Sequence, residues 1–194
     1  MSSARIGHRI VMTTQGDRWI ATIASTIPSW QRQSLEIWFG AWVALGAMLV
    51  YGMVTFPGSE RTFYGICLGF WSYFAFRAWK AVRWRRSGME VIQLSPDGLE
   101  LRLDHGARQG RPQLIPLSMV NDAQVSEPNA RSFFESMDQQ FWVIGGDRIH
   151  IPVQGKTYVF GKQLDVAEAQ QLAKAFNQKL KKLQRASEKD ASEL

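Results

Sequence analysis

The sequence has few of the residues that reactive or metal-binding sites require. Its one cysteine, Cys67, lies in an apolar stretch, which excludes an intramolecular disulfide and a cysteine-based metal cluster. Its three histidines, at positions 8, 105 and 150, have no paired spacing that would indicate a zinc site. No nucleophile elbow is present, and Gly145-Gly146 lacks the lysine and helix of a phosphate loop. We therefore predict a protein that is not an enzyme and needs no metal or other cofactor.

Acidic residues and histidines are missing from two apolar stretches. The first, Ile37 to Phe56, is uncharged over twenty residues, and at about 1.5 Å per residue a helix of this length spans roughly 30 Å, enough to cross a bilayer. The polar turn PGSER follows, and then Thr62 to Phe76 is uncharged. We predict a two-helix transmembrane hairpin within residues 35–82, its second helix extended by snorkelling cations. The alternative is a helical hairpin buried in a soluble core.

Positive charge is concentrated beside these apolar stretches. The chain has a formal net charge of +6, and arginines and lysines flank both ends of the hairpin while its turn has only Arg61. This distribution favours a membrane surface over nucleic acid as the partner, and by the positive-inside rule it predicts that both termini are cytoplasmic. The candidate residues for contact with the membrane surface are Arg77, Lys80, Arg83, Arg85 and Arg86, and the candidate interfacial aromatic residues are Trp38, Trp71, Trp79 and Trp84.

Short alternating segments separated by turn residues follow Arg86 and predict a mainly β domain. A C-terminal amphipathic helix should cover the sheet, because Asp165 can cap it and apolar residues from Val166 to Leu183 form one stripe. The predicted strands are Met89–Leu94, Leu99–Leu103, Gln113–Val120, Ala123–Val125, Gln140–Ile144, Arg148–Val153 and Thr157–Gly161, with a long loop over 126–139.

The N-terminal residues 1–34 also contain a possible hairpin. Ile10 to Thr14 and Trp19 to Ile23 flank the turn Gln15-Gly16-Asp17. This hairpin either adds strands to the later sheet or lies on the lipid as an amphipathic segment. The expected organisation is an N-terminal cytoplasmic segment, the membrane hairpin, a β domain over 83–185 and a flexible tail over 186–194.

The order of these elements resembles that of bacterial membrane-anchored proteins of the pleckstrin-homology-like superfamily. The resemblance rests on the paired apolar helices, on RWRRSGMEVIQLSPDGLEL after them, and on TYVFGKQLDVAEAQQLAKAFNQKL near the end, and it covers roughly half of the chain. It implies a mainly β barrel capped by the C-terminal helix, which binds protein or lipid and has no catalytic motif.

Two functions fit these features. The first is a non-enzymatic interaction module in the bacterial inner membrane, acting as an accessory or assembly subunit of a larger complex with other integral membrane subunits. The second is a sensor that binds anionic lipid headgroups or a small ligand at the membrane surface through Arg83, Arg85 and Arg86. A membrane enzyme whose polar groups are assembled only by the fold is a third possibility.

Overall fold

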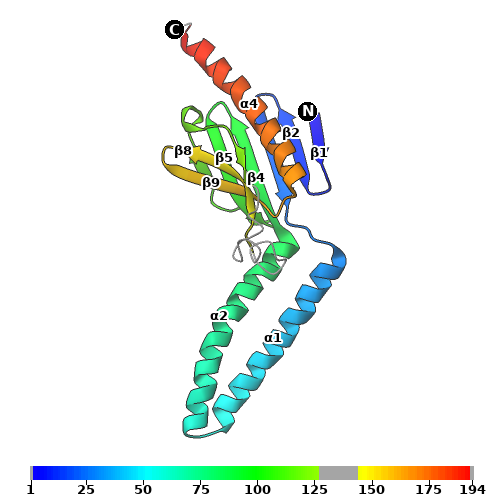
Figure 1. The fold of residues 1–194 in the computed structure, drawn as a ribbon, viewed down its shortest axis with the longest axis vertical. Helices are drawn as coiled ribbons and strands as arrows, with labels where there is room; N and C mark the ends of the chain where they lie inside the picture. The colour runs from blue at the N-terminus through cyan, green and yellow to red at the C-terminus, as the bar shows by residue number, and fades with distance from the viewer. Residues whose placement is uncertain (1, 127–143, 193–194) are drawn as a thin grey trace. The chain divides into compact units, whose positions relative to one another are not determined.

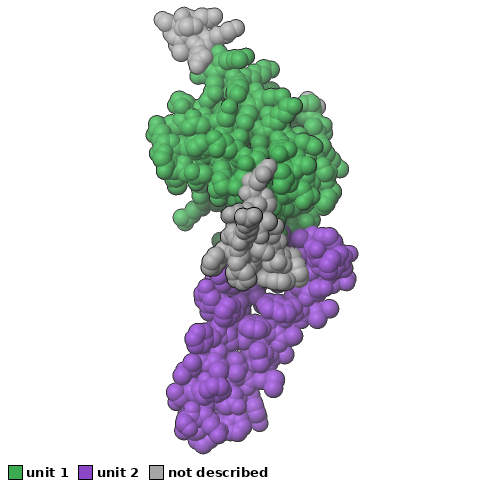
Figure 2. Space-filling view, viewed as in Figure 1, with its two compact units in different colours: residues 1–26, 87–139, 145–194 green, residues 27–86, 140–144 purple. Residues whose placement is uncertain are grey.

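The computed structural model describes residues 2–126 and 144–192 of the chain. These residues divide into two compact units (Figure 2). We call residues 1–26, 87–139 and 145–194 the β unit, and residues 27–86 with 140–144 the helical unit. Residues 127–143 lie outside the described residues. They include all of the predicted loop over 126–139 except Ser126, and all of the predicted strand Gln140–Ile144 except Ile144.

The first sheet of the β unit has six antiparallel strands in sequence order (Figure 1). They are β1 (Ser2–Ile6), β2 (Ile10–Gln15), β3 (Arg18–Ala24), β4 (Gly88–Ser95), β5 (Gly98–His105) and β6 (Gln113–Ile115). Strands β3 and β4 pair from Trp19↔Leu94 to Ala24↔Met89, although residues 27–86 of the helical unit separate them in sequence. The N-terminal hairpin therefore belongs to the sheet and does not form a separate surface segment.

A second, three-stranded sheet consists of β7 (Gln124–Val125), β8 (Asp147–Val153) and β9 (Lys156–Lys162). Between the two sheets the chain forms a short 3-10 helix, η1 (Leu117–Met119). The predicted strand Gln113–Val120 is thus shorter than expected, because Pro116 lacks a backbone N–H and ends the pairing at Ile115.

The C-terminal helix α4 (Val166–Ser192) packs on the β unit, as the apolar stripe predicted. Phe176 is fully buried at the centre of the core, with its ring centroid 6.1 Å from that of Trp19 on β3 and 6.3 Å from that of Phe160 on β9. One helical side chain therefore contacts strands of both sheets. Apolar residues at alternate strand positions, such as Ile92 and Leu94, complete this core.

The helical unit contains α1 (Ser29–Thr55) and α2 (Ser59–Ser87), joined by a short turn. Glycines on α1 let aromatic rings of α2 approach its backbone: a Cβ atom at Gly46 would overlap the ring of Trp71, and one at Gly52 would lie 2.7 Å from the ring of Tyr64. The indole N–H of Trp71 donates to the carbonyl oxygen of Trp42 at 2.8 Å. Ring-to-backbone packing therefore holds the two helices side by side.

The predicted two-helix transmembrane hairpin is wrong. Among the described residues, α1 alone is long and apolar enough to cross a membrane. Helix α2 fails because its uncharged run, Thr62 to Phe76, spans only about 22 Å at ~1.5 Å per residue, against about 30 Å for the apolar core of a bilayer. Snorkelling would have to extend that run past Arg77 and Lys80, and the rest of α2 carries further arginines.

The alternative of a hairpin buried in a soluble core does not describe α1 either. The side chains of Ile37, Met48 and Val54 on α1 are 74%, 69% and 75% exposed, and its buried residues are only Leu35, Gly46 and Gly52. Most of its apolar surface thus faces outward, which a helix at the centre of a water-soluble core would not show.

Candidate functional site

A groove of about 450 Å³ lies between β5 and β9 in the β unit, and we call it the β5–β9 groove. It forms because β6 is only three residues long and covers β5 at Leu99 to Leu101 only. Farther along β5, Leu103 is on the inward face of the sheet, opposite Glu90, yet it is 45% exposed. The inward face of the sheet is therefore open at this point.

The floor and walls of the β5–β9 groove are mainly apolar. Ile92 and Leu101 face each other in register on β4 and β5, and Tyr158 and Phe160 line the opposite side from β9. These residues belong to the core or pack against it. The groove therefore offers an apolar surface continuous with the interior of the β unit.

A cluster of charged residues around the buried Glu90, with the partly buried Lys162 and Asp147, lies at one end of the groove and joins the two sheets. Glu90 on β4 is 2% exposed, and its carboxylate accepts the backbone N–H of Gly161 at 2.6 Å and that of Lys162 at 3.3 Å. The ammonium of Lys162 lies 3.7 Å from Glu90 and donates to Asp147 at 2.6 Å. The Glu90 cluster thus satisfies backbone donors at the end of β9 that would otherwise be buried without an acceptor.

The pKa values of the cluster reflect its burial and its opposite charges. Burial raises the pKa of the Glu90 carboxyl above its ordinary value, while the charge of Lys162 and the N–H of Gly161 act in the opposite direction. Burial by itself lowers the pKa of Lys162, but the charges of Glu90 and Asp147 outweigh it and raise this pKa above that of an ordinary lysine. Lys162 therefore remains an ammonium at neutral pH, which favours a structural ion pair over a nucleophilic amine.

Arg9 connects the N-terminal hairpin to the same end of β9. Its guanidinium donates to the carbonyl oxygen of Gln163 at 2.7 Å, to that of Lys162 at 3.1 Å and to that of Ala24 at 3.0 Å. These bonds fix the chain immediately after β9 against the first sheet. The end of β9 near the Glu90 cluster is therefore held from two sides.

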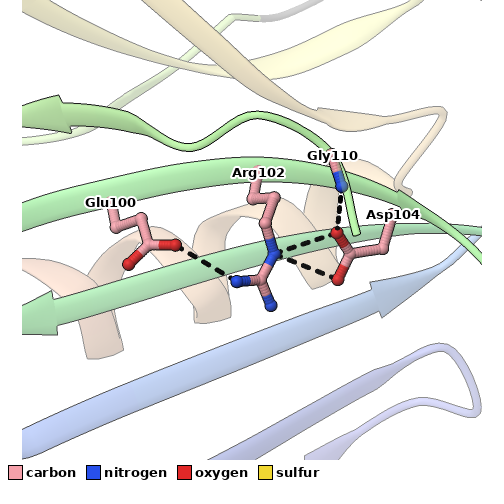
Figure 3. Close-up of polar contacts among 4 residues, drawn as sticks. All are labelled: Glu100, Arg102, Asp104 and Gly110. Carbon is pink, nitrogen blue, oxygen red and sulfur yellow. Dashed lines mark hydrogen bonds and ion pairs between the residues drawn. The ribbon is translucent and has the colours of Figure 1, made fainter. Parts of the chain in front are cut away.

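Arg102, which also lines the groove, is already engaged by acidic neighbours (Figure 3). Its Nε donates to both carboxylate oxygens of Asp104 at 2.9 and 3.1 Å, and its Nη1 donates to Glu100 at 3.2 Å. Asp104 in turn accepts the backbone N–H of Gly110 at 2.9 Å. This network compensates the charge of Arg102, and Lys162 is paired within the Glu90 cluster. Arg111 and Lys156 are therefore the lining cations available for a ligand.

The predicted membrane-surface cations lie along α2 in different environments. Lys80 and Arg83 lie over the rings of Phe76 and Trp79, at 5.8 and 5.6 Å from the centroids. Arg77 donates to the hydroxyl of Tyr73 at 3.4 Å. Arg86 pairs with Glu36 of α1 at 3.0 Å, and Arg85 is 3% exposed. The structure thus leaves Arg85 too buried to contact a surface and divides the remaining cations among local partners.

The predicted interfacial tryptophans also differ from one another. Trp38 is 47% exposed and stacks on Trp42 with 5.4 Å between ring centroids, and Trp79 is 44% exposed. Trp84 is 3% exposed, and Trp71 packs between the helices. Among these four, only Trp38 and Trp79 present substantial ring surface.

The β5–β9 groove and the Glu90 cluster were not predicted from the sequence, although one signal was present. Glu90 alternates with Ile92 and Leu94 and therefore has the inward parity of its strand, where an unpaired carboxylate would be costly. That parity predicts a buried partner for Glu90. It does not identify Lys162, which lies more than seventy residues away.

Comparison with protein-family models finds no match for this chain, and neither does comparison with curated proteins. The pleckstrin-homology-like resemblance therefore stays a prediction. Within residues 2–126 and 144–192, no group of three or more histidine, cysteine, aspartate or glutamate side chains is arranged to hold a metal ion. The geometry of the groove suits binding: an apolar surface beside cations and the edge of a strand.

Proposed function

We propose that this chain is a non-enzymatic interaction module attached to a membrane through α1, and that it serves as an accessory or assembly subunit of a larger membrane complex. The exposed apolar surface of α1 carries this proposal. Ile37 and Val54, near opposite ends of the uncharged run, are about three-quarters exposed. Burial of such surface in lipid or against other apolar helices is strongly favourable, whereas its exposure to water is not.

The sheet topology connects both ends of the helix pair to the same β unit. Strands β3 and β4 pair directly, so the chain leaves the β unit for the helical unit and returns to it at neighbouring strands. The described chain therefore begins and ends in the β unit, and α1 is the segment that we propose to contact lipid. The arginines and lysines of α2 near its junction with β4 favour the cytoplasmic side of a bacterial inner membrane.

A substitution in α1 tests attachment. The substitution Leu45→Arg, near the centre of the helix, should cost about 2.5–3.5 kcal/mol of membrane-insertion free energy. After alkaline-carbonate extraction of isolated membranes, the variant chain should therefore be found in the supernatant. The same substitution at Val11, an exposed position on β2, is the matched control and should leave the chain in the pellet. Equal behaviour of the two variants would contradict attachment through α1.

Affinity purification tests the role as a subunit. The tagged full chain, extracted gently from its native membranes, should co-purify with integral membrane proteins at constant stoichiometry over a second size-separation step. Recovery of the chain alone, at monomeric size and in full yield, would contradict the proposal.

Recognition of anionic lipid is the second candidate, favoured by the arrangement of Lys80 and Arg83. Each lies over an exposed aromatic ring, which is the amphipathic arrangement expected at a headgroup layer. Flotation with vesicles containing phosphatidylserine, compared with pure phosphatidylcholine vesicles, tests it. The joint substitution Lys80→Gln, Arg83→Gln and Arg86→Gln should abolish a preference for the anionic vesicles. The control substitution in α4, Lys174→Gln with Lys182→Gln, should not.

A further inference from the structure

One edge of β9 has unpaired backbone groups. Strands β8 and β9 are joined by the two-residue turn Gln154-Gly155, and both turn residues have positive φ angles, +40° and +81°. A two-residue turn is closed by a hydrogen-bonded pair, here Val153 and Lys156. Because hydrogen-bonded and non-bonded pairs alternate along an antiparallel ladder, Thr157 and Val159 of β9 occupy non-bonded positions.

Two neighbouring contacts agree with this alternation. Thr157 is opposite Pro152, which has no N–H and whose carbonyl oxygen instead accepts from Asn121 at 2.9 Å. Gly161 is the next residue after Thr157 and Val159 in this alternation, and its backbone N–H donates to Glu90 and not to β8. The N–H and C=O groups of Thr157 and Val159 therefore point to the same free edge, where the described residues provide them with no partner.

This free edge borders the β5–β9 groove. Thr157 and Val159 line the groove on one side, and Leu101 and Leu103 line it on the other. Leu103 and Val159 are each 45% exposed. A strand added along β9 would thus form backbone hydrogen bonds and also cover apolar side chains that the described residues leave open.

The charge of the groove indicates what kind of strand fits. Among its cations, Arg102 is paired with Glu100 and Asp104, and Lys162 with Glu90 and Asp147. Arg111 is exposed and Lys156 lies over the ring of Tyr158 at 4.8 Å, and neither has an acidic partner among the described residues. An occupant with carboxylates at alternate positions would complement these two cations, whereas a basic one would be repelled.

We propose that the β5–β9 groove binds an extended segment of a partner protein, with alternating apolar and acidic residues, which adds to the free edge of β9. The inference rests on the proposed role as an interaction module and specifies the chemistry of its partner. The backbone of Thr157 and Val159 supplies affinity, and the leucines with Arg111 and Lys156 select the side chains. Glu90 and Arg9 hold the end of β9 that is nearest the Glu90 cluster, which lowers the cost of ordering that end when the segment binds.

A displayed library of random octapeptides provides the probe. It is selected on the full chain in detergent micelles and depleted on the Val159→Pro variant, in which the outward N–H is absent. Proline is tolerated at an edge position whose N–H faces away from the ladder, so this variant should keep the fold. The expected result is a consensus of alternating apolar and acidic residues. A basic consensus, or one with helical spacing, would overturn the proposal.

A synthetic peptide with the selected sequence then tests the site by fluorescence anisotropy. Val159→Pro should weaken its binding at least about tenfold, a loss of about 1.4 kcal/mol, while Val159→Thr, which keeps the N–H, should change it little. Thr157→Pro is the second blocking variant if Val159→Pro unfolds. The joint charge-reversing substitution Arg111→Glu and Lys156→Glu should weaken binding of the acidic peptide. It should not weaken binding of a control peptide in which glutamines replace the acidic residues. Unchanged binding to both proline variants would refute strand addition.

Hydrogen exchange separates other occupants of the edge. In the free chain, the amides of Thr157 and Val159 should exchange rapidly and become protected only when the peptide is added. Protection without peptide in a monomer would mean that the chain covers its own edge, and protection in a dimer would indicate a second copy; either result overturns the proposal. Partners that co-purify equally with wild type and Val159→Pro would refute this inference and leave the proposed function standing.

Discussion

Replacing Glu90 with leucine should destabilise the β unit by removing the acceptor for two backbone N–H groups at the end of β9. The carboxylate of Glu90 accepts from Gly161 and Lys162, and Gly161 is buried. A buried donor left without a partner costs about 1–3 kcal/mol. Since Lys162 is only partly buried, we expect a total loss of about 3 kcal/mol. This loss corresponds to a fall of about 6–12 °C in the melting temperature for a chain of this size.

The matched variants separate the hydrogen bonds from the charge. Glu90→Gln keeps a carbonyl oxygen for the N–H of Gly161 and should lose less than half as much free energy of unfolding. Glu100→Leu removes a glutamate whose side chain is 21% exposed and whose ion pair with Arg102 lies at 3.2 Å; it should cost less than about 1 kcal/mol. Urea unfolding of the full chain in detergent, followed by near-ultraviolet circular dichroism, measures all three variants.

Equal costs for Glu90→Leu and Glu100→Leu would refute this role of Glu90, because the buried bonds would then contribute nothing beyond a partly exposed ion pair. Equal costs for Glu90→Gln and Glu90→Leu would refute it as well. In that case the charge, and not the acceptor oxygen, would hold the two sheets together at β9.

Three further outcomes are expected. Burial raises the pKa of Glu90, so the folded chain holds this proton more tightly than the unfolded chain does; the unfolding free energy of the wild type, relative to Glu90→Gln, should therefore fall as the pH rises above about 4.3 in urea titrations. In α1, Gly46→Ala places a Cβ against the ring of Trp71 and should cost about 1–3 kcal/mol in thermal unfolding, whereas Gly40→Ala, with open space around it, should be neutral or stabilising. In the β4–β5 turn, Gly98→Ala meets the carbonyl group of Ile115 at a φ of +146° and should destabilise more than Gly155→Ala, which has a φ of +81° and no neighbour within 4 Å; differential scanning calorimetry compares the two.

Periodicity predicted most strands of the β unit, because it reflects which side chains face the core. The alternation in 89–94 and 99–103 corresponds to β4 and β5, and the stripe after Asp165 corresponds to α4. Strand β1 was missed since SSARI lacks that alternation: four of its five residues are exposed, and it is held mainly by backbone pairing with β2. Backbone pairing at a sheet edge leaves little trace in a pattern of apolar residues.

The second helix was misjudged for a related reason. Its uncharged run, Thr62 to Phe76, has the composition of a shortened membrane span that flanking cations could extend by snorkelling. In the structure, two of its aromatic residues serve the contact with α1: Trp71 reaches the backbone of Trp42, and Tyr64 lies against Gly52. An apolar residue therefore does not by itself distinguish a surface facing lipid from one facing another helix. The same uncertainty hid the groove, because the exposure of Leu103 depends on where β6 ends.

The connection between β3 and β4 explains how one chain accommodates both units. Neighbouring antiparallel strands are usually joined by a few residues, but here about 60 residues intervene. Closing a flexible loop costs only about 0.6 kcal/mol more for each doubling of its length, so roughly four doublings add about 2.4 kcal/mol. Since α1 and α2 pack through Gly46, Gly52 and Trp71, the inserted segment is ordered and brings its own ends closer together, which lowers that cost further. Strands β3 and β4 therefore keep a continuous register despite the inserted helices. Their pairing runs from Trp19↔Leu94 to Ala24↔Met89, and at the junction the backbone N–H of Ser25 donates to the carbonyl oxygen of Gly88 at 3.0 Å. A change that loosens the helical unit should consequently weaken this end of the sheet first.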